Sequence, residues 1–239
     1  MSLKITIPRE YTGTIMTSHF ISSTVVFQQI KIDDPLSFIP GQYASFLLDI
    51  HRRPLSFASL PENDLLDFAI DITPGGVCSQ YAARATVGQK VRFLAPYGRF
   101  VLEEPNTRPI LFVATGTGIA PIRAQLKDLF KTVPSQPVTL VFGNYDEGRI
   151  LFRDEFEKLA AEHANLTFIP VLSDADKPWA GETGWVTHVI PRLIPNLPEW
   201  SVYICGNPPM VRDMQALLLE KGLAKEHIHS EQFTYANRS

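Results

Sequence analysis

The stretch HRRPLSFAS at residues 51–59 does most to predict the fold, because two later segments complete it. These segments are GGVCS at residues 75–79 and CGNPPM at residues 205–210. In chain order they supply an arginine, a serine, a glycine turn that ends in serine, and a late cysteine-glycine pair. No single segment is decisive, but the ordered set is specific and spans most of the chain.

The composition is that of an ordinary soluble globular protein. With 239 residues, of which 45% are hydrophobic and 20% charged, the chain can form one large domain or two small ones. A net charge of −3 provides no basic field that would favour nucleic acid. The two cysteines, Cys78 and Cys205, are too few for a disulfide scaffold or an iron–sulphur cluster, and they suit a reducing cytosol.

The chain shows no sign of export or membrane insertion. Its first residues, MSLKITIPREYTG, lack the apolar core of a signal peptide. The longest apolar run, at residues 110–114, is far too short to span a bilayer. We therefore expect a cytoplasmic protein with no membrane span.

The first hundred residues have the pattern of a small antiparallel β-barrel. Short strand-like runs are separated by turns rich in proline, glycine and acidic residues. The expected strands are 25–30, 42–50, 66–72 and 90–94. The one helix expected in this part follows Gly76 and covers residues 79–84.

Beyond a polar, proline-bounded linker at residues 103–109, strands and helices alternate. Strands are expected at residues 110–114, 138–142, 166–172, 202–205 and 228–233. Helices are expected around Ile122, Leu126, Leu129 and Phe130, at 151–163 with Phe152, Phe156 and Leu159 inward, at 186–193, and at 210–220 with Gly222 as cap. This alternation predicts a parallel sheet covered on both faces, and hence two domains, at residues 1–104 and 105–239.

Arg53 and residues 75–79 are candidates for binding a diphosphate. A guanidinium grips phosphate oxygens bidentately, and a glycine turn that opens a helix offers free backbone N–H groups and the positive end of the helix dipole. Each has an ordinary alternative, namely a surface arginine and a simple helix start. Together, at this separation in the chain, they favour the phosphate interpretation.

Two later segments suggest a nucleotide site. Residues 114–121 (ATGTGIAP) follow a buried strand and open a helix, although Pro121 stands where the third glycine of the G-x-G-x-x-G fingerprint belongs. Cys205 ends a later strand, and ligands of such sheets bind beyond the carboxyl ends of the strands. The alternatives are a simple tight turn and an ordinary buried cysteine.

The ordered set resembles the ferredoxin–NADP reductase superfamily, in which a flavin passes electrons between a nicotinamide and a one-electron partner. The resemblance implies an antiparallel Greek-key β-barrel that binds FAD, then an α/β parallel-sheet domain that binds NADH or NADPH, with the site in the cleft between them. It implies hydride transfer from NAD(P)H to FAD, and then transfer of single electrons to a separate ferredoxin, flavodoxin or oxygenase component. The chain departs from the family at Leu55, which replaces a tyrosine that stacks on the flavin.

The resemblance also assigns roles to single residues. Ser56 is the hydrogen-bond partner of flavin N5, Cys205 lies beside the nicotinamide C4, and Glu231 relays protons or orders the site. The residues expected to bind FAD are Arg53, Pro54, Leu55, Ser56, Ala69, Ile70, Asp71, Gly75, Gly76, Val77, Cys78, Ser79 and Phe233. The residues expected to bind NAD(P)H are Thr115, Gly116, Thr117, Gly118, Pro121, Asp146, Asp174, Cys205, Gly206, Asn207, Pro208 and Met210.

NADH is expected to be preferred over NADPH. The loops at residues 144–147 and 173–176 are acidic, and Asp71 replaces a lysine that plant-type members use for NADP(H), so a 2′-phosphate would be repelled. The alternative is that Arg149 or Lys177 turns in to bind the phosphate.

Three other functions stay open at this point. A free flavin or ferric reductase would share every motif, and a non-catalytic flavoprotein subunit would retain FAD without oxidising NAD(P)H. A flavin-free dehydrogenase would leave residues 51–59 and 75–79 unexplained. No metal cluster is expected, since the six histidines are scattered along the chain.

Overall fold

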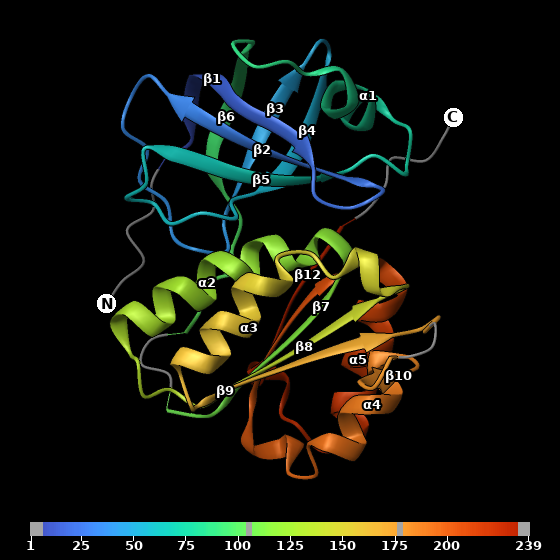
Figure 1. Ribbon diagram of the computed structural model, residues 1–239. Coiled ribbons are helices and arrows are strands. Elements are labelled where there is room, and N and C mark those ends of the chain that lie inside the picture. The colour runs from blue at the N-terminus through green and yellow to red at the C-terminus, as the bar shows by residue number, and fades with distance from the viewer. Residues whose placement is uncertain (1–6, 104–106, 176–178, 234–239) are drawn as a thin grey trace. The chain divides into compact units, whose positions relative to one another are not determined.

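The computed structural model describes residues 7–103, 107–175 and 179–233 (Figure 1). They form two compact units, the first made of residues 7–103 and 120–128, and the second of the remaining described residues. Each unit has its own six-stranded sheet. The predicted domain boundary at residues 104 and 105 lies outside the described residues and stays a prediction.

The first unit contains an antiparallel sheet in the order β4-β3-β6-β1-β2-β5. Its strands are β1 (Arg9–Phe20), β2 (Val25–Ile32), β3 (Tyr43–Leu48), β4 (His51–Ser56), β5 (Leu65–Asp71) and β6 (Lys90–Tyr97). Just past β4, the Ala58 N–H donates to the Asp67 carbonyl of β5 over 2.9 Å, so the two edge strands of the sheet meet. The predicted antiparallel barrel is thereby confirmed.

The residue pattern does not predict the strands β1 and β4. In β1 only Tyr11, Gly13 and Ile15 alternate as buried residues, and the rest of the strand is polar or exposed. The predicted strand at residues 42–50 is too long. Asp49 adopts a φ of 53° and, with Ile50, turns the chain from β3 into β4.

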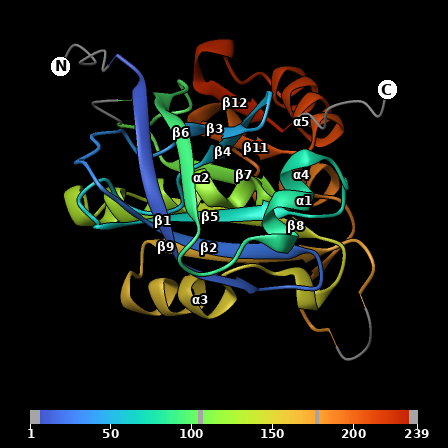
Figure 2. The same cartoon turned by 90° about the horizontal axis from the view of Figure 1, so that it is seen from above.

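Aromatic rings fill the core of the barrel. Phe46, Phe68 and Phe93 are fully buried, and the Phe46 ring centroid lies 5.0 Å from that of Phe68 and 5.3 Å from that of Phe93. The helix α1 (Val77–Arg84) packs on this core through Ala82 and lies next to β5 (Figure 2). It begins at Val77, directly after Gly76 as predicted, and ends at the predicted Arg84.

The second unit contains a parallel sheet in the order β10-β9-β8-β7-β11-β12 (Figure 1). Its strands are β7 (Ile110–Thr115), β8 (Val138–Asn144), β9 (Leu166–Leu172), β10 (Glu182–Thr183), β11 (Ser201–Gly206) and β12 (Ile228–Gln232). All five predicted strands are confirmed, and the short β10 is an addition. The strand order reverses at β7, because β8 and β9 extend from one side of it and β11 and β12 from the other.

Helices cover both faces of this sheet, as predicted. The helices α4 (Val186–Leu193) and α5 (Pro208–Glu220) pack on one face, against Val113, Val141 and Ile204. The helix α3 (Arg153–Glu162) lies on the other face, where the ring of Phe156 packs 5.4 Å from that of Phe168. The helix α2 (Ile119–Thr132) follows β7, and its predicted apolar residues are buried. Short 3₁₀ turns are η1 (Gly116–Gly118), η2 (Glu147–Arg149), η3 (Leu197–Glu199) and η4 (Lys225–His227).

Two helix boundaries differ from the prediction. Phe152 adopts a left-handed φ of 56°, so it precedes α3, and its half-buried ring packs edge-on against that of Phe156 at 6.5 Å. The helix α5 begins at Pro208, before the predicted Met210. Its predicted cap is confirmed, because the Gly222 N–H donates to the Leu219 carbonyl and the Leu223 N–H to the Leu218 carbonyl, each over 3.0 Å.

Candidate functional site

In the first unit, Arg53 lies near the first turn of α1. Burial raises the pKa of the Cys78 thiol to about 11, and the positive charge of Arg53 acts on the same thiol in the opposite direction. Arg53 comes from β4 and Cys78 from α1, so the fold brings the arginine within electrostatic range of the first turn of α1. That the two bind phosphate stays a prediction.

The glycine turn before α1 has room for an anion. Gly76 is the N-cap residue of α1, and no side chain forms a capping hydrogen bond at this end of the helix. A Cβ atom placed on Gly76 would meet no other atom within 4 Å, so the side-chain position of this residue faces open space. Ser79 does not reach into this space, because its hydroxyl donates to the Asp71 carbonyl over 3.2 Å. The backbone N–H groups of the turn, and not Ser79, are therefore the donors that fit a diphosphate.

The strands β4 and β5 are the two edges of the barrel sheet. Leu55 of β4 is half-buried and packs against the barrel core, and Pro54 is exposed. Ser56, the last residue of β4, is 7% exposed and lies opposite Tyr43 of β3. Ala69 and Ile70 of β5 pair on one side only, with β2, so the other side of their backbone is free of a strand partner. These edge strands therefore offer backbone groups without a strand partner, as the predicted FAD site requires.

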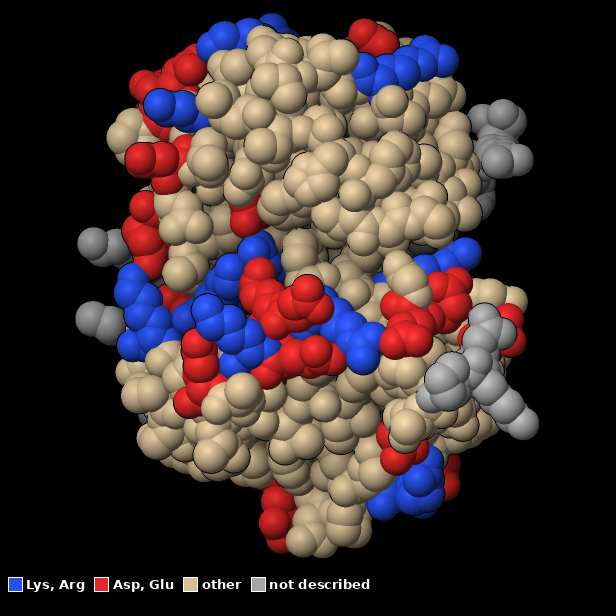
Figure 3. Space-filling model, viewed as in Figure 1, with Lys and Arg blue, Asp and Glu red and all other residues tan. Residues whose placement is uncertain are grey.

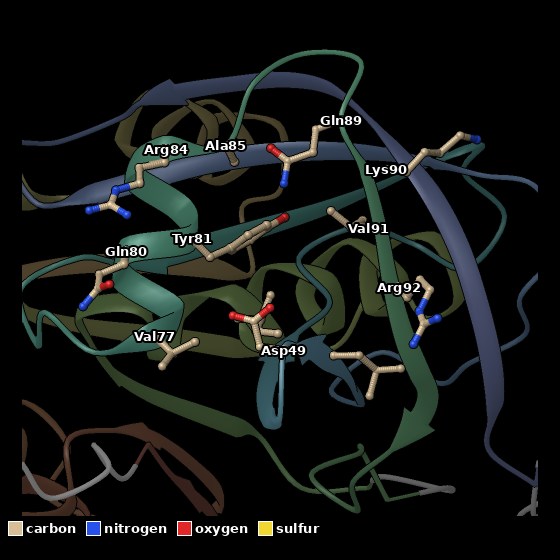
Figure 4. Close-up of a pocket in the computed structure, with 12 residues that line it drawn as sticks. Asp49, Val77, Gln80, Tyr81, Arg84, Ala85, Gln89, Lys90, Val91 and Arg92 are labelled. Atoms are coloured by element: carbon tan, nitrogen blue, oxygen red, sulfur yellow. The ribbon is translucent and has the colours of Figure 1, made fainter. Parts of the chain in front are cut away.

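A pocket of about 450 Å³ lies between α1, β6 and the turn that joins β3 to β4 (Figure 4). In Figure 4 the ring of Tyr81 extends from α1 toward β6, and its hydroxyl donates to Gln28 Oε1 over 3.0 Å. Among the residues expected to bind FAD, Val77 lines this pocket. The pocket therefore borders the glycine turn and does not coincide with it.

In the second unit, the segments 114–121 and 205–210 are in direct contact. Thr115 Oγ1 accepts hydrogen bonds from the backbone N–H and the side-chain amide of Asn207, each over 3.3 Å. A Cβ atom on Gly118 would lie 2.3 Å from the Cys205 carbonyl oxygen, so only glycine allows the turn this close to β11. Gly116 faces open space, since a Cβ atom there would meet nothing within 4 Å.

This contact lies at the point where the strand order of the parallel sheet reverses, between the carboxyl ends of β7 and β11. Ligands of such sheets bind at this point. Thr117 lies in η1 and Pro121 in the first turn of α2. Asn207 caps α5 by accepting the Met210 N–H over 2.9 Å, and Pro208 is the first residue of that helix.

Cys205 and Glu231 are neighbours across the β11–β12 pair. Cys205 is fully buried, and burial, followed by the charge of Glu231, raises the pKa of its thiol well above the ordinary value. Burial also raises the pKa of Glu231 to about 7, and its Oε2 atom has no hydrogen-bond partner among the described residues. The Phe233 N–H donates to the Gly206 carbonyl over 2.9 Å, which holds Phe233 at the same end of the sheet.

The buried Glu231 gives a testable pH effect on stability. Its pKa in the folded chain, about 7, lies above the ordinary 4.5, so folding favours the protonated form and stability falls as the pH rises from 4.5 to 7. We expect Glu231→Gln to stabilise the chain by about 2–3 kcal/mol at pH 8 and to add nothing at pH 4.5. Urea unfolding at both pH values measures this, with the exposed Glu220→Gln as control. An equal effect of Glu231→Gln at both pH values would contradict it.

The acidic loops after β8 and β9 are in contact with each other. The Tyr145 hydroxyl bonds to the Asp174 carboxylate, which raises the pKa of the tyrosine. Arg149 pairs with Asp146 over 3.0 Å, and its guanidinium lies 5.3 Å from the centre of the Tyr145 ring. Arg149 is thus already held by its own loop. Asp176 and Lys177 lie outside the described residues.

Charges of both signs are interleaved on the face that Figure 3 shows. Part of this pattern comes from η2 and α3, where Arg153 pairs with Glu147 and Glu157. Exposed pairs of this kind contribute little to stability. On this face, basic residues do not gather apart from acidic ones.

The comparisons with known proteins agree with this geometry. Residues 112–216 match the model of the oxidoreductase NAD-binding domain. The chain is 35% identical over 223 residues to the ferredoxin–NAD(P)(+) reductase component of the naphthalene 1,2-dioxygenase/salicylate 5-hydroxylase systems of Ralstonia sp., a match that covers 92% of this chain and 68% of that protein. It is 31% identical to ferredoxin–NADP reductase B of Sorangium cellulosum, with 82% of this chain and 85% of that protein covered. The chain belongs to the ferredoxin–NAD(P) reductase family.

Solved structures support this family fold. The Amycolatopsis cytochrome P450 reductase GcoB is 28% identical and superposes with a TM-score of 0.90, over 95% of this chain and 70% of that one. The ferredoxin NADP⁺ reductase of Neisseria gonorrhoeae, at 22% identity and a TM-score of 0.81 over 93% of this chain and 98% of that one, shares the fold. The predicted superfamily and the predicted fold class are both confirmed.

One buried ion pair is not predicted from the sequence. Arg123 of α2 and Asp67 of β5, both in the first unit, form an ion pair over 2.8 Å, with side chains only 8% and 10% exposed. The available signal was a charged residue inside each of two otherwise apolar runs, at residues 119–126 and 65–70. Which charges pair cannot be read from such a pattern without the fold.

Neither a membrane-spanning helix nor a metal-binding cluster is found among the described residues. None of its described helices has the length and apolar character needed to cross a membrane. No group of three or more His, Cys, Asp or Glu side chains within the described ranges is arranged to hold a metal ion.

Proposed function

We propose that this chain is an FAD-dependent reductase that takes a hydride from NADH and passes single electrons to a separate acceptor protein. The observation that carries the proposal is that the charge of Arg53 acts on Cys78 in the first turn of α1, where the side-chain position of Gly76 faces open space. A flavin-free dehydrogenase would have no need for an arginine and an open helix N-terminus in a β-barrel unit. The named relatives in Ralstonia and Sorangium are ferredoxin reductases, which supports the proposed class of acceptor.

The first unit has the groups that an FAD molecule requires. Arg53 and the N–H groups of residues 76–79 would hold the diphosphate, and Leu55 and the free edge of Ala69–Asp71 would contact the ring system, whereas the Gly75 N–H already donates to the Ile72 carbonyl. Ser56 would supply a hydroxyl as a hydrogen-bond partner for the ring. Bound FAD supplies the redox chemistry, because it accepts a hydride as a two-electron unit and releases electrons singly.

The second unit holds the nicotinamide nucleotide at the carboxyl ends of β7 and β11. The turn at Gly116–Gly118 holds the diphosphate of the nucleotide. Cys205, which is buried and protonated, packs against the nicotinamide and does not attack it. Glu231, with a pKa of about 7, holds a proton near neutral pH, and Phe233 supplies an apolar surface beside Gly206.

The acceptor is proposed to be a one-electron carrier, in line with the ferredoxin reductases among the named relatives. The two cysteines of this sequence are both free thiols, and an iron–sulphur cluster normally takes four ligands. An iron–sulphur protein, a flavodoxin or an oxygenase component fits this requirement. The free thiols also support a reducing compartment such as the cytosol.

The cofactor and the turnover substrate test the proposed function together. We expect the purified protein to be yellow and to release FAD, identified by mass spectrometry. We expect slow NADH oxidation with riboflavin and faster oxidation with a ferredoxin. Fast turnover with riboflavin and weak retention of FAD would favour a free flavin reductase instead, and retained FAD without NADH oxidation would favour a non-catalytic subunit.

We expect NADH to be used with a higher kcat/KM than NADPH. Asp146 and Asp174 repel a 2′-phosphate, and Arg149 is held by Asp146 and Tyr145. Asp146→Ala releases Arg149 and should raise kcat/KM for NADPH about 10-fold.

Steady-state kinetics with both nucleotides measure this preference. Asp154→Ala, in the exposed first turn of α3, is the matched control and should leave the ratio of the two kcat/KM values unchanged. A wild-type kcat/KM for NADPH equal to or above that for NADH would show that the acidic loops do not select the nucleotide.

A further inference from the structure

Arg123 is a buried cation that contacts two separate parts of the barrel unit. It lies in α2 and is 7% exposed. Its Nη1 atom donates to the Ala58 carbonyl over 2.6 Å and to Asp67 Oδ2 over 2.8 Å. Ala58 follows the end of β4, and Asp67 lies within β5, so a single guanidinium nitrogen spans the two edge strands of the sheet.

Other hydrogen bonds converge on the same place. The Ala58 N–H donates to the Asp67 carbonyl over 2.9 Å, and the Asp67 N–H donates to Ser59 Oγ over 3.1 Å. Gln29 Nε2 donates to Asp67 Oδ1 over 3.0 Å, so both carboxylate oxygens are engaged. Arg123 therefore belongs to a connected polar network that fixes the segment after β4 against β5.

A gain in stability alone does not explain why Arg123 and Asp67 are buried as an ion pair. A buried ion pair is often no more stabilising than apolar residues of similar volume, because both charges must be desolvated. What the pair adds is a fixed geometry at both acceptors. Those acceptors are next to the flavin elements, since Ala58 closely follows Ser56 and Asp67 closely precedes Ala69–Asp71.

We propose that Arg123 is a positioning residue for the flavin. By holding the Ala58 carbonyl and the Asp67 carboxylate together, it sets the distance between the Ser56 hydroxyl on β4 and the backbone of Ala69–Asp71 on β5. This inference rests on the proposed function, because it assumes that FAD binds along these two strands. A shift of a reacting group by about 1 Å can slow a reaction about 100-fold while binding is retained.

The test uses Arg123→Met and the double variant Arg123→Met/Asp67→Asn in the full chain. The single variant leaves Asp67 buried without this cation and is expected to lose stability. The double variant removes both charges and should recover stability, but it still lacks the donor to Ala58. Lys131→Met, an exposed cation in the last turn of the same helix, is the matched control.

Two readouts separate positioning from stability. In the FAD-free protein, hydrogen exchange of the amides of residues 56–59 should rise in both Arg123 variants and stay unchanged in Lys131→Met. In the FAD-bound protein, anaerobic stopped-flow reduction by NADH should slow about 10- to 100-fold in both Arg123 variants, with FAD affinity within about threefold of wild type.

A double variant that recovers its melting temperature, keeps wild-type exchange at residues 56–59 and reduces FAD at the wild-type rate would overturn the role of Arg123. That result would leave the proposed function intact. A wild-type chain that binds no FAD would overturn the proposed function and this inference with it.

Discussion

Replacing Arg53 with alanine is expected to weaken FAD binding about 10- to 150-fold, which corresponds to about 1.5–3 kcal/mol for a charge-assisted hydrogen bond. The guanidinium is near the first turn of α1, where the side-chain position of Gly76 faces open space. Without this cation, the diphosphate keeps only the backbone N–H groups of the turn. Titration of FAD-free protein with FAD, followed by flavin fluorescence, measures the change in affinity.

The chain offers a matched control for this variant. Arg52 is the preceding residue of the same strand, is exposed, and points to the opposite face of the sheet. Arg52→Ala removes the same charge and should leave FAD affinity within about twofold, since an exposed charge contributes little. Equal losses in both variants would mean that Arg53 acts only through the net charge of the surface.

Replacing Gly118 with alanine is expected to weaken NADH binding about 5- to 150-fold, as judged from the 1–3 kcal/mol that overpacking typically costs. The added Cβ atom would lie 2.3 Å from the Cys205 carbonyl oxygen and 2.7 Å from the Gly206 nitrogen. These are backbone atoms, so the turn or β11 must shift. The shift would move the diphosphate turn away from the end of β11, where the nicotinamide is proposed to bind.

Stopped-flow reduction at increasing NADH concentrations gives the dissociation constant of NADH in this variant. Affinity for FAD is the internal control, because Gly118 and Cys205 both belong to the second unit and Arg53 to the first. Unchanged NADH affinity would contradict the assignment of this turn to the nucleotide. A parallel loss of FAD would instead indicate a general loss of structure.

The parallel sheet can be predicted from the sequence more fully than the barrel. The strands β7 (ILFVAT) and β8 (VTLVFGN) are apolar almost throughout, because a parallel sheet is covered on both faces. The barrel strand β1 (REYTGTIMTSHF) buries few residues, so its pattern is weak. The start of α3 is missed because apolar periodicity does not reveal the left-handed conformation of Phe152.

For the candidate site, short sequence segments carry more information than single residues. The approach of Thr115 to Asn207 follows from two turns at the carboxyl ends of adjacent parallel strands. The pairing of Arg123 with Asp67 depends on how α2 meets the barrel, which no local pattern encodes. The hydrogen bond from Ser79 to Asp71 likewise shows that a serine in a phosphate-like turn can serve the turn itself.

The central claim is that one chain binds FAD and reduces it with NADH. Anaerobic addition of NADH to the purified protein, followed by its absorbance spectrum, tests this most directly. The account predicts oxidised flavin bands that bleach on addition of about one equivalent of NADH, and no iron–sulphur absorption. A colourless protein that cannot be reconstituted with FAD, or bound FAD that stays oxidised with excess NADH and NADPH, would contradict it.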